Sequence, residues 1–152
     1  MSLRNRQTEL TKRLGIAHPI VQGPFGGGLS TVALTATVSN LGGLGSFGAH
    51  LLPPDRIGAL ADELRGRTTQ PFALNLWVSD HDPGGVAVSE REVERVLRLF
   101  EPYFVELGVP LPVQPERFHP SFDQQVEALL DARPPVFSFV FGVASARVLT
   151  EC

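Results

Sequence analysis

The chain has 152 residues, of which 43% are hydrophobic, and a formal net charge of −3 at pH 7. This length predicts one domain with a packed core, and the weakly acidic balance argues against a surface for nucleic acid or anionic membranes. No apolar run approaches the roughly 20 residues that cross a bilayer, and the one cysteine, Cys152, argues against a disulfide framework. We therefore expect a cytoplasmic protein with no membrane or nucleic-acid partner.

Strands and helices alternate along the chain. In chain order, the patterns predict a helix over 8–14, a strand over 20–22, a helix over 31–40, a strand over 44–49, a helix from 53 to about 64 and a strand over 72–77. The second half should hold a polar loop over 78–88, a helix from 89 broken near Pro102, a proline-rich excursion over 108–120, a helix from 121 to about 130, a strand over 136–141 and the start of a helix over 145–152. Strands that alternate with helices in this way form parallel sheets.

Three of the predicted helices begin at capping residues. Ser30 is a good N-cap for the helix that follows it. Ser89 with Glu92, and Ser121 with Gln124, match the capping box, in which two side chains satisfy two free amide groups. The first turn after Ser30 should therefore direct its amide groups toward the glycine-rich residues that precede it.

The parallel order leaves two architectures open. One is a doubly wound open sheet, and the other is the first half of a (β/α)8 barrel, which typically needs ~250 residues. Along the last strand Phe137, Phe139 and Phe141 alternate with Ser138 and Val140. One face of that strand suits an outer helix layer and the other suits a tapered barrel interior. We therefore expect an α/β fold made of the first four βα units of a truncated (β/α)8 TIM barrel.

Residues 23–28, GPFGGG, form a glycine-rich bend between the first strand and the next helix, and we call them the glycine bend. Glycines let a ligand touch the main chain, and barrel enzymes place ligands at the carboxyl ends of their strands. The bend lacks the Lys-Ser/Thr ending of a phosphate-binding P-loop, which argues against nucleoside triphosphates. The glycine bend is either a ligand site or a tight turn with no further role.

Residues 43–48, GLGSFG, match the GxGxxG pattern of dinucleotide-binding proteins. That fingerprint needs a strand before it and a helix opening inside it, whereas here a helix precedes it and the glycines lie in the strand. We expect these glycines to serve close packing between helix and strand.

Asn75 lies in the middle of an apolar strand, on the same face as Ala73 and Trp77. A buried amide is costly unless its donors and acceptors are used. The sequence leaves open whether Asn75 contacts a ligand or makes a structural hydrogen bond.

The four histidines are scattered, and no pair has the spacing of metal ligands, so we expect no metal site. His50 and His81 each follow a predicted strand. Either could line a site at the carboxyl edge of the sheet, or lie in a solvated loop.

Four stretches together resemble the flavin-dependent nitronate monooxygenases, formerly called 2-nitropropane dioxygenases. They are PIVQGPFGGGLS (19–30), VSNLGGLGS (38–46), RTTQPFALNL (67–76) and VFSFVFG (136–142). Each stretch is moderately specific, and the ordered set covers nearly the whole chain. The resemblance implies an FMN-bearing barrel that oxidises alkyl nitronates with O2 to a carbonyl compound and nitrite.

The resemblance also implies which residues hold the cofactor. By position, Gly23, Pro24, Phe25 and Gly26 would lie beside the flavin ring, with backbone amides near its reactive edge. Asn75 matches the family's flavin-contacting asparagine, which favours a ligand role for it. The family often has methionine where Phe25 stands.

Val140 stands where many members of that family carry a histidine that removes a proton from the substrate. A valine side chain cannot accept a proton. Because a nitronate is already deprotonated, we expect nitronates to be better substrates than neutral nitroalkanes, and we assign no catalytic residue.

The family chain is about twice as long as this one, so residues 1–152 would form the N-terminal half of a flavin-binding barrel. The loops after strands seven and eight, which commonly bind phosphate in barrels, would be absent. We therefore expect a truncated or cleaved piece that holds FMN weakly, is inactive alone, and associates with itself or with a C-terminal half through its open sheet edges.

Two other functions stay open at this point. One is a related FMN barrel, such as an NAD(P)H-dependent enoyl reductase, which would be reduced by a nicotinamide donor. The other is a non-catalytic half-barrel that serves as an assembly partner and binds no flavin.

Overall fold

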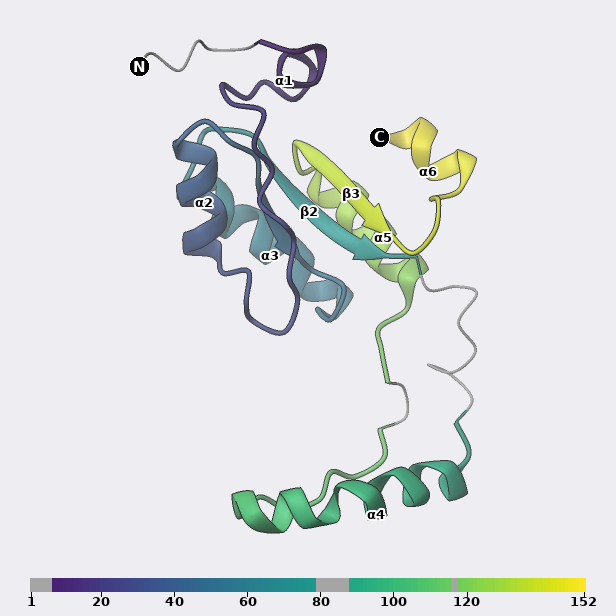
Figure 1. Cartoon of the computed structure of the whole chain (residues 1–152). Coiled ribbons are helices and arrows are strands. Elements are labelled where there is room, and N and C mark those ends of the chain that lie inside the picture. Colours follow the sequence, from purple (N-terminus) through teal and green to yellow (C-terminus); the bar gives the residue numbers. More distant parts are fainter. Residues whose placement is uncertain (1–6, 79–87, 116–117) are drawn as a thin grey trace. The chain divides into compact units, whose positions relative to one another are not determined.

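The computed structural model describes residues 7–78, 88–115 and 118–152 (Figure 1). Along the chain its elements are α1 (Glu9–Leu14), α2 (Val32–Asn40), β1 (Gly45–Gly48), α3 (Pro54–Arg65), β2 (Phe72–Trp77), α4 (Glu90–Leu107), α5 (Phe122–Ala132), β3 (Val136–Val140) and α6 (Ala146–Glu151). They belong to two compact units: Met1–Asp80 with Pro120–Cys152, and His81–His119. The first unit holds the sheet and the second holds α4. The single half-barrel domain expected from the sequence stays a prediction.

The strands form a parallel sheet in the order β1-β2-β3, which confirms the predicted parallel arrangement. The predicted first strand is reduced to one bridge, between Val21 and Leu44. Leu44 N–H donates to the Ile20 carbonyl at 2.9 Å, so this segment lies beside β1 without forming a full strand. It is short because Pro19 and Pro24 flank it, and proline offers no N–H to a ladder.

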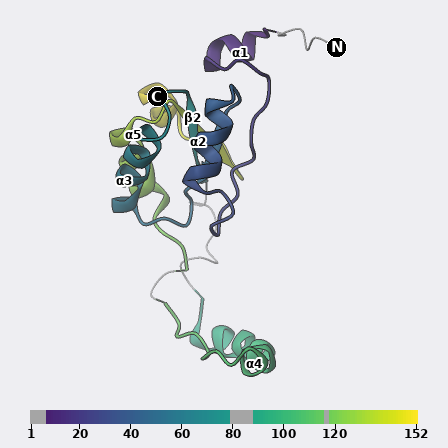
Figure 2. The ribbon, with the colours of Figure 1, turned by 90° about the vertical axis from the view of Figure 1, so that its left-hand side faces the viewer.

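The two faces of the sheet are packed differently. Phe72 and Leu74 of β2 are fully buried in a core with side chains of α3 and α5, including Leu64 and Val126. Figure 2 shows α3 and α5 on one side of the sheet and the segment between α1 and α2 on the other. The apolar residues that alternate along β2 therefore face the helices, as the period of two predicts.

The opposite face is covered at its amino end by a second, smaller cluster. Ile16 and Leu44 pack there with Ala73, which lies on the face of β2 that also carries Asn75 and Trp77. The segment between α1 and α2 thus covers the amino end of this face. Asn75, the polar residue of β2, lies nearer the carboxyl end of the same face.

The glycines of β1 allow α2 to approach the strand closely. A Cβ atom on Gly45 would lie 1.9 Å from the Thr35 carbonyl oxygen of α2, and Gly45 N–H donates to the Ser39 hydroxyl at 3.2 Å. This confirms the expected helix–strand packing for Gly45, whereas Gly48 packs on the main chain of the glycine bend.

The helix termini correct two of the three capping predictions and confirm the third. The N-cap of α2 is Thr31, whose hydroxyl accepts from Leu34 N–H, because Ser30 is turned toward the glycine bend instead. The capping box of Ser89 and Glu92 is confirmed, whereas Ser121 makes no side-chain cap bond at the start of α5.

The helix expected to break at Pro102 continues through it to Leu107. A proline removes one helical hydrogen bond, but this alone does not end an 18-residue helix whose other turns stay intact.

Candidate functional site

The carboxyl ends of the parallel strands meet at one edge of the sheet, where the sequence-predicted residues gather. Gly48, Asn75 and Ser138 are paired across the three strands, so their side-chain positions share one face. His50 follows β1, and Val140 pairs with Trp77 at the ends of β3 and β2. We call this part of the sheet, made up of Gly48, His50, Asn75, Trp77, Ser138 and Val140, the inner carboxyl edge.

The glycine bend is held by two side chains, Gln22 and Ser30. The Ser30 hydroxyl accepts from Phe25 N–H at 2.8 Å, and Ser30 is buried. Gln22 donates through Nε2 to Ser30 Oγ at 3.2 Å and to the Gly23 carbonyl, and its Oε1 accepts from Ser46 N–H of β1 at 3.1 Å. These bonds tie the bend to β1, a role that the capping interpretation of Ser30 missed.

The main chain of Phe25 and Gly26 packs directly on β1. A Cβ atom on Gly48 would lie 2.8 Å from the Phe25 carbonyl carbon and 2.9 Å from Gly26 N. A Cβ atom on Gly26 would lie 2.1 Å from Cε1 of His50. Position 48 therefore requires glycine, because main chain blocks its Cβ, and a side chain on Gly26 would displace the His50 ring. Both contacts place the bend against the inner carboxyl edge.

Part of the glycine bend is open and part is covered. No atom lies within 4 Å of a Cβ built on Gly27 or Gly28, whose φ angles are +65° and +84°. The Cβ side of Gly26 is covered by His50, and that of Gly23 lies 3.1 Å from the Phe25 ring. Phe25 itself is 63% exposed. Bare main chain is therefore accessible at Gly27 and Gly28.

Asn75 combines a structural bond with a free acceptor. The residue is 1% exposed, and its Nδ2 donates to the Ser138 hydroxyl at 3.0 Å. Its Oδ1 is buried and has no hydrogen-bond partner among the described residues. Leaving a buried acceptor without a partner lowers the stability of a fold by about 1–3 kcal/mol. This oxygen is therefore a candidate to accept a hydrogen bond from a ligand.

Aromatic rings form the rim of the inner carboxyl edge. His50 stacks on Trp77 with ring centroids 3.6 Å apart, and Phe141 meets Trp77 edge-on at 5.0 Å. His50 is buried, which lowers the pKa of its imidazole below the ordinary value and keeps the ring neutral at pH 7. His81 lies outside the described residues.

Val140 occupies the end of β3 with an apolar side chain that is 37% exposed. It pairs with Trp77 and offers no proton acceptor at this position. Among the described residues, no group of three or more metal-binding side chains is present. In that part of the chain, no helix is long and apolar enough to cross a membrane.

The site thus offers bare main chain, one buried acceptor and aromatic walls. The free Oδ1 of Asn75 suits an N–H donor, and the open amides at Gly27 and Gly28 suit acceptors on a ligand. Flat heterocycles carry both kinds of group.

The chain is similar in sequence to proteins of one known family. The family described as nitronate monooxygenase matches residues 7–152. A nitronate monooxygenase of Pseudomonas aeruginosa is 38% identical over 135 residues, covering 87% of this chain and 37% of that protein. One from Paraburkholderia phytofirmans is 35% identical over 142 residues, covering 91% of this chain and 37% of that protein.

Two solved structures show the same fold. A nitroalkane oxidase from Streptomyces ansochromogenes has a TM-score of 0.72 and 30% identity, covering 93% of this chain and 38% of its own. FabK from Thermotoga maritima has a TM-score of 0.57 and 26% identity, covering 93% of this chain and 32% of its own. The chain thus spans less than two fifths of these proteins.

Proposed function

Because the chain belongs to the nitronate monooxygenase family, we propose that it forms part of an enzyme that oxidises alkyl nitronates with O2. The products would be a carbonyl compound and nitrite. The observation that carries this proposal is the free, buried Oδ1 of Asn75 beside the glycine bend. It is an acceptor that the protein itself leaves without a partner.

FMN is the cofactor that we propose for this site, and the residues present fit its ring. When bound, FMN would supply the electron transfer between the substrate and O2. Asn75 Oδ1 would accept an N–H from the ring, and Ser138 would hold the amide in that orientation. The open main chain at Gly27 and Gly28 would provide donors.

The bend residues Gly23, Pro24, Phe25 and Gly26 are proposed as neighbours of the ring. Phe25 N–H already donates to Ser30, so Phe25 would contact the ring through its exposed side chain. The Cβ side of Gly26 faces His50, which leaves its main chain as the part that a ring can approach.

We also propose that the described sheet is the start of a (β/α)8 barrel of four βα units, with residues 20–22 in the place of the first strand. The parallel order and the TM-score of 0.72 to a nitroalkane oxidase support this arrangement. The chain would then pair with a second half-barrel or with another copy, and would work in the cytoplasm.

The proposed function is tested with the purified chain, FMN and a nitronate. We expect weak FMN uptake, seen as a change in flavin absorbance on titration, and uptake that is at least tenfold weaker in Asn75→Leu. Turnover, measured as O2 uptake and nitrite release, should need the complete barrel.

In the complete enzyme the nitronate should be oxidised faster than its neutral nitroalkane, because Val140 accepts no proton. Equal rates for the two would contradict this assignment. Flavin bleaching by NADH without any response to nitronates would favour the enoyl reductase alternative, and no FMN uptake even by a complete barrel would favour a non-catalytic role.

A further inference from the structure

A second buried polar atom without a partner belongs to His50, which stacks on Trp77, two positions along β2 from Asn75. Nδ1 of His50 is buried and makes no hydrogen bond within the described residues. The Phe25–Gly26 main chain packs on Gly48, which pairs with Asn75, and Gly26 also abuts the His50 ring. The two unpaired atoms therefore belong to residues on either side of one short main-chain segment.

The His50 ring is held firmly in this position. It stacks on Trp77 with an interplanar angle of 8°. Gln125 of α5 donates through Nε2 to the carbonyl of His50 at 2.9 Å and to that of Leu52 at 2.7 Å. The main chain after β1 is thus anchored to a buried glutamine of α5, so the ring is preorganised before any ligand binds.

A solvated loop histidine would not have these properties. His50 is only 6% exposed, and a buried ring nitrogen without a partner is costly unless something satisfies it. The elements packed against the ring contribute Trp77 and the main chain at Gly26, neither of which titrates. Because burial lowers the pKa of His50, the ring stays neutral at pH 7, and its buried nitrogen lacks a polar partner among the described residues.

We propose that His50 is a second polar anchor of the ligand site, binding through its ring nitrogen the same flat heterocycle that Asn75 binds through Oδ1. This inference rests on the proposed function, since it takes that heterocycle to be the flavin ring. His50 lies at the end of β1 and Val140 at the end of β3, so His50 does not replace the missing family histidine. It is a binding residue, and we assign no proton transfer to it.

The sole tryptophan of the chain, Trp77, reports on His50 without any turnover. A protonated imidazole quenches a stacked indole, so the fluorescence of Trp77 should fall as the pH is lowered through the titration of His50. Saturating FMN should move that titration to lower pH, because a ligand bound to the neutral ring disfavours its protonation. A purely structural His50 would titrate at the same pH with and without FMN.

Variants of the full chain complete the test. His50→Phe keeps a ring on Trp77 and removes the nitrogens, and it should weaken FMN binding about tenfold, as expected for the loss of one buried hydrogen bond. His50→Asn, which restores a polar group near Nδ1, should recover part of the affinity. His18→Phe, at an exposed histidine, is the matched control and should leave it unchanged.

The outcomes separate this inference from the proposed function. If neither the wild-type chain nor a complete barrel takes up FMN, the proposed function fails and the inference fails with it. If either binds FMN while the Trp77 titration does not move, the inference alone is overturned, even where His50→Phe fails to fold. Equal FMN affinity of wild type and a folded His50→Phe overturns it too.

Discussion

The hydrogen bond between Asn75 and Ser138 leaves one end of the Asn75 amide unpaired in the structure. Its Nδ2 donates to Ser138, so the group left unpaired is the oxygen. Ser138 is therefore a positioning residue for Asn75. Without its hydroxyl the amide would be free to rotate, and the site would lose its preference for an N–H donor.

Replacing Ser138 should therefore destabilise the chain as well as loosen the site. We expect Ser138→Ala to lower the free energy of unfolding by about 1–3 kcal/mol, because it leaves Asn75 Nδ2 buried without a partner. Urea denaturation measures this change. The double variant Asn75→Leu with Ser138→Ala removes both polar partners and should recover part of the loss; strictly additive losses would contradict this explanation.

His50 should make stability depend on pH. Burial holds the pKa of its imidazole below the ordinary value of 6.5, which the ring regains on unfolding. The unfolded chain therefore binds a proton more readily, and the contribution of His50 to stability is complete above pH 6.5 and decreases as the pH falls below it.

The comparison with His50→Phe isolates this effect, since all other titrating groups are shared. The difference in unfolding free energy between wild type and this variant should be constant above pH 6.5 and shift against the wild type below it. Denaturant titrations at a series of pH values measure it. A difference that does not vary with pH would show that His50 titrates normally in the folded chain.

At the scale of elements, the packing of the helices can be tested at two glycines, one closely packed and one in open space. Gly45 of β1 has the Thr35 carbonyl where its Cβ would lie, whereas Gly58 of α3 has no atom within 4 Å. We expect Gly45→Ala to separate α2 from β1 and lower the melting temperature. Gly58→Ala should instead stabilise the helix by about 0.5–1 kcal/mol, because glycine is a poor helix former.

Thermal unfolding followed by circular dichroism checks both substitutions, and Gly58→Ala serves as the matched control. If the two variants shift the melting temperature in the same direction, α2 and β1 do not pack as closely as described.

The elements also show where sequence patterns are reliable. The period of two along β2 correctly placed Asn75 on one face with Ala73 and Trp77, and the structure shows Leu74 on the opposite face, in the helix layer. The strand expected over 20–22 formed only one bridge, since its length depends on ladder bonds to β1 and on the prolines around it. Ser30 capped no helix, because its hydroxyl accepts a hydrogen bond from Phe25 N–H in the glycine bend instead.

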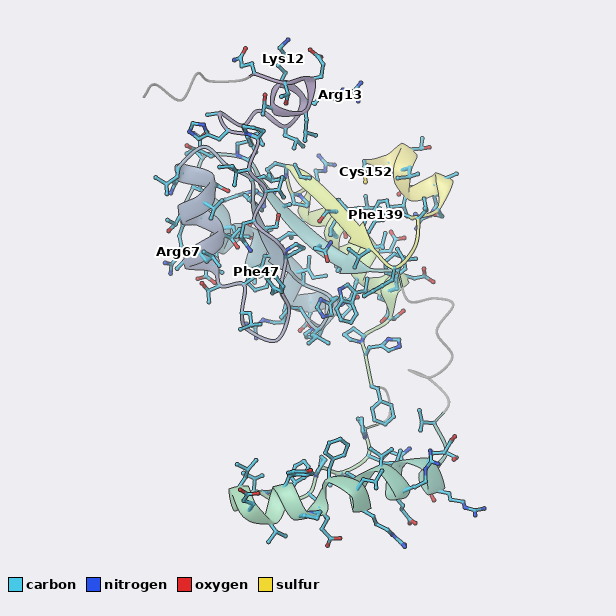
Figure 3. The ribbon with its side chains drawn as sticks, viewed as in Figure 1. Lys12, Arg13, Phe47, Arg67, Phe139 and Cys152 are labelled. Atoms are coloured by element: carbon cyan, nitrogen blue, oxygen red, sulfur yellow. The ribbon has the colours of Figure 1, made fainter. Side chains whose placement is uncertain are left out.

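At the scale of the whole molecule, β3 ends the sheet formed by the described residues, and an apolar groove runs along it. The groove has a volume of about 420 Å³ and lies between β3, α5 and α6, with Phe137, Phe139 and Leu149 in its lining. Figure 3 shows Phe139 and Cys152 on this side of the sheet. An open strand edge beside an apolar groove is a template for association.

We therefore expect the isolated chain to associate as its concentration rises. Leu149→Lys places a charge in the groove and should raise the monomer fraction, whereas Val113→Lys, at a residue that is 89% exposed, should not. Light scattering after gel filtration measures the monomer fraction. A wild-type chain that stays monomeric at all concentrations would contradict this prediction.

The sequence by itself determined the alternation of helices with parallel strands, the β2 side chains that share a face with Asn75, and the family membership. These follow from local rules, because periodicity, capping and turn chemistry act within a few residues of one another. Only the tertiary structure decided that Ser138, 63 positions away, takes one end of the Asn75 amide, that Trp77 and Gly26 enclose His50, and that Gly26 is covered while Gly28 is open. Those contacts depend on strand register and on how the glycine bend folds back onto β1, and no local pattern encodes either.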